Sequence, residues 1–144
     1  MSNTLQETAQ WFVEAVRAPS DDNRMVQLGV HFEEVGEMFE ALGIGAIADS
    51  MHELGMAFKK KEVNKEDLVI DRKALLDALA DQIVTATGVA HMYGLDIVGA
   101  LNEVNRSNYS KFVNGRAVFD ENGKIKKGQD YSKPNLDPFV GEVP

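Results

Sequence analysis

The segment of residues 74–93 constrains the fold of this chain more than any other. Its only ionisable side chains are Asp77, Asp81, His91 and Tyr93. A helix that is apolar on almost every side is normally buried among other helices. The segment therefore predicts a long, buried helix inside a helical bundle.

Helical periodicity extends over most of the first 112 residues. Apolar residues recur at spacings of three and four, as in Leu5, Ala9, Phe12 and Val16, which places them on one helix face. Residues that favour helix caps and turns divide this pattern into five segments. The expected helices cover about residues 5–16, 24–42, 47–58, 71–94 and 96–112, with Asp71 and Asp96 as N-caps.

The periodicity is lost after residue 112. Residues 118–128 are typical of a short hairpin that turns at Asn122-Gly123, and an irregular tail follows. We therefore expect an all-α fold, a helical bundle of about five helices with a short C-terminal hairpin and an irregular tail. Residues 1–112 would form the helical domain, and residues 113–144 would belong to the same domain.

Composition limits the classes of function. With 144 residues, a net charge of −8 and no cysteine, the chain suits one domain without disulfides or thiolate metal sites. The negative charge argues against a nucleic-acid-binding protein, and no apolar run approaches the length of a membrane span. The N-terminus lacks the features of a signal peptide, so we expect a cytoplasmic protein that binds no membrane.

The stretch HFEEVGEMFEAL, residues 31–42, places three glutamates close together. Glu34 and Glu37 lie about 60° apart around a helix axis, and Glu33 and Glu37 lie about 40° apart. On the expected helix Glu34 lies at the edge of the apolar face, and Glu33 points farthest from that face. Like charges at this spacing repel one another, so the glutamates either form a solvated helix face or hold a cation.

Asp77 and Asp81 form a second acidic pair, about 40° apart on the long helix. No lysine or arginine lies within residues 74–94 to neutralise the pair, and burying unpaired carboxylates is costly. Either the pair is exposed or bound to a lysine from another segment, or a divalent cation binds it together with the glutamates. Oxygen ligands without cysteine favour Mg²⁺, Mn²⁺ or Ca²⁺, and Mg²⁺ commonly also binds a substrate phosphate.

Together these motifs resemble the MazG-like all-α nucleotide pyrophosphohydrolase superfamily, in particular its phage-type members. The family signature is E-E-x-x-E, here Glu33-Glu34-x-x-Glu37, followed by E-x-x-D on the next long helix, here ending in Asp81. Ala78 stands where the family has the glutamate of the second motif, and the neighbouring Asp77 is the candidate replacement. The downstream stretches YGLDIVGALNEVNRSNYSKF and GKIKKGQDYSKP are also similar to family elements.

The resemblance implies an enzyme that hydrolyses a (d)NTP, for example dGTP or dATP, to the (d)NMP and pyrophosphate. Mg²⁺ is the expected cofactor, with Mn²⁺ able to replace it. Members of the family are usually homodimers or homotetramers, and we expect the same here, in the cytoplasm of a bacterial or phage-infected cell.

The resemblance also assigns roles to individual residues. The expected catalytic residues are Glu33, Glu34 and Glu37, with Glu33 as the general base, and the expected metal ligands are Glu34, Glu37, Asp77 and Asp81. Asn108 and Lys111 match a family element and would bind phosphate or sugar. The basic run KIKKG and the tyrosine after it add Lys126, Lys127 and Tyr131 as candidates for binding the triphosphate or the base, although a solvated hairpin explains them equally well.

An acidic helical interaction module is the alternative from a different class. Its carboxylates would face a basic protein partner, and metal would play no part. A ferritin-like di-iron bundle is not supported, because none of the three histidines follows a glutamate at the Glu-x-x-His spacing.

Overall fold

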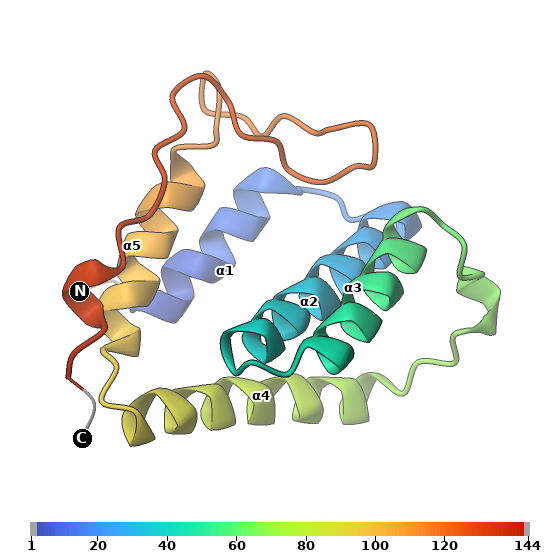
Figure 1. Cartoon of the computed structure of the whole chain (residues 1–144). Helices are drawn as coiled ribbons and strands as arrows, with labels where there is room; N and C mark the ends of the chain where they lie inside the picture. The colour runs from blue at the N-terminus through green and yellow to red at the C-terminus, as the bar shows by residue number, and fades with distance from the viewer. Residues whose placement is uncertain (1–2, 143–144) are drawn as a thin grey trace. The chain divides into compact units, whose positions relative to one another are not determined.

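The computed structural model describes residues 3–142, and within this range the fold is all-α, with five α-helices and no β-strand (Figure 1). The expected fold class is therefore confirmed. Two short 3-10 helices, η1 (Lys65–Asp67) and η2 (Asp137–Phe139), precede α4 and lie near the C-terminus, respectively. The α-helices are α1 (Thr4–Ala15), α2 (Asp21–Ala41), α3 (Gly45–Lys59), α4 (Arg72–Met92) and α5 (Ile97–Tyr109).

Side-chain caps determine where α4 and α5 begin. The Asp71 carboxylate accepts hydrogen bonds from the backbone N–H groups of Lys73 and Ala74, both at 3.0 Å. Asp96 caps α5 in a similar way by accepting the N–H of Gly99 at 2.9 Å. Both N-caps expected from the sequence are therefore confirmed.

Helix α2 begins at Asp21, earlier than the sequence predicts. Ser20 and Asn23 form a capping box, in which the Asn23 N–H donates to Ser20 Oγ at 3.1 Å and the Ser20 N–H donates to Asn23 Oδ1 at 2.9 Å. The usual third residue of such a box is Glu or Gln. Asn23 and the residues before it are instead typical of a turn. Residues 17–23 therefore predict a longer connection between the first two helices than the structure has.

The chain divides into two compact units, each built from separate stretches of sequence. The first unit contains Met1–Ala15, Ile70–Val118 and Lys127–Pro144, and therefore α1, α4, α5 and the tail. The second unit contains Val16–Val69 and Phe119–Lys126, and therefore α2, α3 and the hairpin tip. The C-terminal segment is thus divided between the two units.

In the second unit, α2 and α3 lie side by side along a seam of glycines (Figure 1). A Cβ atom on Gly29 would lie only 2.6 Å from the carbonyl oxygen of Gly55, and one on Gly36 would lie 3.2 Å from Cβ of Met51. These glycines allow the backbones to approach closely, and they lie at the packed face of α2 together with the buried Met25 and Val26.

In the first unit, α1 packs against α5 through a buried amide. The Asn105 side chain is only 2% exposed. Its Oδ1 accepts a hydrogen bond from the Thr8 hydroxyl at 2.8 Å, and its Nδ2 donates to the Thr4 carbonyl at 3.0 Å. Since both polar groups of the amide are bonded, its burial carries little penalty.

Helix α4 exposes most of its side chains, so the predicted burial is wrong. Residues 72–87 are exposed along their whole length, and Leu76 and Val84 keep 69% and 68% of their surface accessible. An apolar composition indicates that a helix packs against another surface, but it does not identify whether that surface belongs to the same chain or to a partner. Within residues 3–142 no single helix is long and apolar enough to cross a membrane; α4 and α5 satisfy that criterion only as a pair, bent by 119°.

The hairpin tip has the expected turn. Phe119 and Ile125 pair as an isolated β-bridge, and between them the Asp120 N–H donates to the Lys124 carbonyl at 2.8 Å. The Gly123 N–H closes the turn by donating to the Asp120 carbonyl at 3.0 Å. The expected turn is therefore confirmed, although its arms are too short to form strands.

Candidate functional site

The three glutamates of α2 have different surroundings. The Glu33 side chain is 15% exposed and forms an ion pair with Lys59 of α3, whose side chain is 10% exposed. The Lys124 ammonium lies 3.8 Å from the other carboxylate oxygen of Glu33. Glu34 and Glu37 are exposed. Glu33, expected to point farthest from the apolar face, is nevertheless partly buried, because the glycine seam turns this side of α2 toward α3.

The two aspartates of α4 are exposed. Asp77 and Asp81 lie in the first unit, and neither carboxylate has a hydrogen-bond or ionic partner among residues 3–142. The sequence left open whether these carboxylates are exposed or paired with a lysine, and in the structure they are exposed. The cost of burial no longer argues for a cation at these residues, and their oxygen chemistry remains the reason to consider one.

The predicted metal ligands are divided between the units. Glu34 and Glu37 belong to the second unit, whereas Asp77 and Asp81 belong to the first. Within neither unit do three His, Asp or Glu side chains of residues 3–142 form a group that could hold a metal ion. Each of the two pairs offers only carboxylate oxygens, the kind of ligand that suits Mg²⁺ or Mn²⁺.

Asn108 and Lys111, at the end of α5 and just after it, lie together. The Lys111 ammonium donates a hydrogen bond to Asn108 Oδ1 at 2.8 Å and lies 5.8 Å from the centre of the Trp11 ring. Trp11 is 5% exposed, stacks on Phe112 with ring centres 5.9 Å apart, and has a buried indole N–H that bonds to no protein atom of residues 3–142. A cation over an indole ring is held by the ring electrons.

The tail brings a second lysine and a tyrosine to the same unit. The Lys127 ammonium lies 4.9 Å from the centre of the Tyr131 ring. A Cβ atom on Gly128 would lie 3.0 Å from the Lys111 carbonyl oxygen, so the backbone that follows Lys127 runs directly against the end of α5. Lys126 belongs to the second unit and is not part of this group. We call Trp11, Asn108, Lys111, Lys127 and Tyr131 the lysine–aromatic cluster.

Two further aromatic rings, those of Phe112 and Tyr109, lie next to the cluster. The Tyr109 ring lies 5.7 Å from that of Phe112, nearly perpendicular to it. Burial raises the pKa of the Tyr109 hydroxyl above its ordinary value, and the negative charges of Glu14 and Glu7 raise it further. Tyr109 is therefore a neutral hydrogen-bonding group at neutral pH.

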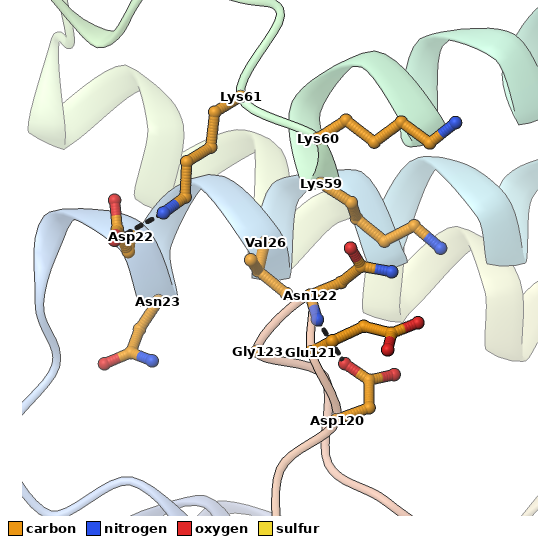
Figure 2. Close-up of a pocket in the computed structure, with 10 residues that line it drawn as sticks. All are labelled: Asp22, Asn23, Val26, Lys59, Lys60, Lys61, Asp120, Glu121, Asn122 and Gly123. Carbon is orange, nitrogen blue, oxygen red and sulfur yellow. Dashed lines mark hydrogen bonds and ion pairs between the residues drawn. The ribbon is translucent and has the colours of Figure 1, made fainter.

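A separate pocket of about 420 Å³ lies in the second unit (Figure 2). Its basic lining includes Lys59 and Lys61, but Lys59 pairs with Glu33, and Lys61 pairs with Asp22 at 2.8 Å. In Figure 2 the Lys60 side chain extends away from the acidic hairpin tip. This polar pocket contains none of the catalytic, metal-binding or substrate-binding residues predicted from the sequence, and its paired charges do not favour an ionic ligand.

Sequence reasoning missed the residues that hold the tail. Glu103 accepts two hydrogen bonds from Arg106, at 2.8 and 2.7 Å, and a third from the backbone N–H of Asn135 at 2.9 Å. The i,i+3 spacing of Glu103 and Arg106 is a sequence signal for an ion pair on one helix face. Lys59 gave no comparable signal, because its partner lies on a different helix.

Comparison of the chain with family models, with curated proteins and with solved structures finds no match. The possible function is therefore inferred from the side chains and their surroundings.

Proposed function

We propose that this protein is a Mg²⁺-dependent nucleotide pyrophosphohydrolase that converts a (d)NTP, such as dGTP or dATP, into the (d)NMP and pyrophosphate. The observation that carries the proposal is the lysine–aromatic cluster. Four of the five residues that the sequence predicts for substrate binding, Asn108, Lys111, Lys127 and Tyr131, belong to one unit, and the loop that carries Lys127 runs against Lys111. Two ammonium groups, an amide and aromatic rings suit a ligand with phosphates and a base.

In the proposed reaction water adds across the α–β phosphoanhydride. Lys111 and Lys127 bind phosphate oxygens as point charges, and Asn108 positions Lys111 while its amide donates to phosphate or sugar. The bridging phosphorus–oxygen bond breaks, pyrophosphate leaves, and Glu33 is the candidate to take the proton of the attacking water. The ion pair with Lys59 fixes the position of the Glu33 side chain.

Glu34, Glu37, Asp77 and Asp81 are the residues that would hold Mg²⁺ in this proposal, and Mn²⁺ would bind the same oxygen ligands. When bound, the ion would neutralise phosphate charge and polarise the bond that breaks. The exposure of these four side chains supports the role, because exposed carboxylates can reach a ligand that arrives from solvent.

We also infer that the protein forms a homodimer or homotetramer through α4. Large apolar side chains are exposed along much of this helix, and such a surface on a folded protein usually marks an interaction site. A second copy of the same helix offers a complementary apolar face, as in closed symmetric oligomers.

The exposed face of α4 also favours the alternative, an acidic helical module that binds a protein and has no catalytic activity. Calorimetric titration with Mn²⁺ distinguishes the two functions. A pyrophosphohydrolase should give saturable heat that is weaker in Glu37→Gln and Asp81→Asn, whereas a module without metal should give none.

The proposal is tested by the products and by the carboxylates. We expect Glu37→Gln and Asp81→Asn each to abolish the release of pyrophosphate from (d)NTP while helicity, measured by circular dichroism, stays unchanged. Glu62→Gln and Asp49→Asn are matched controls, because both residues are exposed and lie outside the proposed site. Full turnover in either of the first two variants would remove that residue from the metal site.

A further inference from the structure

The tail of residues 127–142 has little structure of its own. Apart from the short 3-10 helix η2 (Asp137–Phe139), it contains no helix or strand, and most of its side chains are exposed. A segment of this kind keeps its position only through bonds to its neighbours. Its neighbour within the first unit is α5, along which the tail is drawn in Figure 1.

Glu103 and Arg106 form the central tie between α5 and the tail. Glu103 accepts the Asn135 N–H at 2.9 Å, and Arg106 donates to the Lys133 carbonyl at 3.1 Å while it also donates twice to Glu103. The hydrogen bonds from Arg106, and next the one from Asn135, lower the pKa of Glu103 to about 2. The tie is therefore fully formed at neutral pH.

A second tie follows closely along the helix. The Ser132 backbone N–H donates to the Ser110 hydroxyl oxygen at 2.8 Å, and that hydroxyl donates to the Ser107 carbonyl at 2.6 Å. The Tyr131 N–H donates to the Gly128 carbonyl at 3.2 Å, which closes a turn between the tail and its lysine. The two ties thus hold residues 132–135, and the turn connects them to the part of the tail that carries Lys127 and Tyr131.

We propose that Glu103 is a positioning residue for polyphosphate binding, because with Arg106 it holds the tail so that the backbone next to Lys127 and Tyr131 stays against residues 110 and 111. The inference rests on the proposed function for the identity of the ligand, a nucleoside triphosphate. Without the tie, the tail would have to be ordered when the ligand binds. Fixing the backbone of one residue costs about 1–2 kcal/mol. Because about 1.4 kcal/mol corresponds to a tenfold change in the dissociation constant, the loss of order at even one residue should weaken binding about tenfold.

The direction in which anion affinity changes distinguishes this positioning role from a direct electrostatic effect of the Glu103 charge. Glu103 carries a negative charge in the same unit as the lysines proposed to bind the anion. If electrostatics alone acted, removing that charge would reduce the repulsion of an anion and strengthen its binding. Loss of the tie should weaken the binding instead. The substitution Glu103→Gln therefore gives opposite results under the two explanations.

The experiment measures binding of inorganic tripolyphosphate through the fluorescence of Trp11, the only tryptophan of the chain. Lys111 lies over the Trp11 ring, so an anion that binds Lys111 should change the emission. We expect a saturable change in the unaltered protein and a dissociation constant about tenfold larger in Glu103→Gln. Ser110→Ala, which removes the second tie without changing any charge, should weaken binding in the same direction.

Glu62→Gln is the matched control, because Glu62 is exposed, lies in the second unit and carries the same charge. It should leave the dissociation constant unchanged or slightly smaller. In a hydrolysis assay Glu103→Gln should raise KM and leave kcat within about twofold, since no reacting group is removed.

Equal or tighter binding of tripolyphosphate by Glu103→Gln would overturn the inference, as would the absence of any saturable signal in the unaltered protein. The titration needs no turnover. Weaker binding in Glu103→Gln, in a protein that hydrolyses no (d)NTP, would support the positioning role while contradicting the proposed hydrolase.

Discussion

At the scale of single residues, helical spacing and packing give different orientations for the glutamates of α2. Spacing alone places Glu33 away from the apolar face, but the structure pairs it with Lys59 at the seam between α2 and α3. Glu34 and Glu37 are exposed, as the proposed binding of a metal ion from solvent requires. A glutamate's sequence position thus predicts its neighbours on its own helix, and the packed helix determines its other partners.

Glu103 gives a prediction for stability against pH. Its folded-state pKa of about 2 lies below the ordinary value of 4.5. A carboxyl with a lowered pKa stabilises the folded state above its unfolded pKa, and this contribution is lost as the pH falls from about 4.5 toward about 2. We expect Glu103→Gln to unfold at lower urea than the unaltered protein at pH 6, and the difference to shrink as the pH falls through this window.

Urea unfolding followed by Trp11 fluorescence measures this effect within the first unit. Ser110→Ala is the control, because a serine does not titrate and its effect should not change across the same pH range. A difference between Glu103→Gln and the unaltered protein that stays constant from pH 6 to about 2 would contradict the assigned contacts.

Asn108 and Lys111 could be paired from the sequence, because their i,i+3 spacing places them on one helix face. Their closeness to Trp11 could not, since it depends on how α1 packs against α5. The same holds for the tail next to Lys127 and Tyr131, whose backbone lies against residues 110 and 111 although the tail has no periodicity.

At the scale of elements, the helix limits follow from local chemistry. Asp71 and Asp96 cap α4 and α5 as expected, because N-capping depends only on neighbouring backbone N–H groups. The packed face of α2 was only partly predictable from its large apolar residues. Met25 and Val26 are buried, but the face also depends on Gly29 and Gly36, whose missing side chains leave no hydrophobic signal.

The glycine seam gives a second prediction. Gly29→Ala should lower the free energy of unfolding by about 1–3 kcal/mol, because its Cβ would lie 2.6 Å from the Gly55 carbonyl oxygen. Gly88→Ala on α4 is the matched control, since no atom lies within 4 Å of its Cβ, and alanine there should stabilise by about 0.5–1 kcal/mol.

Urea unfolding followed by circular dichroism measures both variants. If Gly29→Ala were as stable as the unaltered protein, the close approach of α2 and α3 would be disproved.

At the scale of the whole molecule, the sequence indicates one bundle, whereas the structure has two units made of interleaved segments. Residues 119–126 belong with α2 and α3, although they lie far from these helices in the sequence. Hydrophobic periodicity cannot reveal such an arrangement, because it indicates which face of a helix is apolar but not which segment packs against that face.

The exposed face of α4 predicts self-association. Leu76, Leu79 and Ile83 lie at i, i+3 and i+7, on one side of the helix. Leu76→Glu would place a charge in an apolar interface, so we expect it to convert the oligomer to a monomer, as measured by size-exclusion chromatography with light scattering. Val69→Glu is the control, because Val69 is 98% exposed outside the helices and should not affect the assembly. A monomeric unaltered protein would contradict the proposed homo-oligomer.

The most direct test of the central claim is to identify the products that the unaltered protein forms from each common (d)NTP with Mg²⁺. The proposed function predicts equal amounts of a nucleoside monophosphate and pyrophosphate from at least one substrate, with no reaction after chelation of the metal. Formation of nucleoside diphosphate and orthophosphate, or no turnover of any (d)NTP, would contradict it.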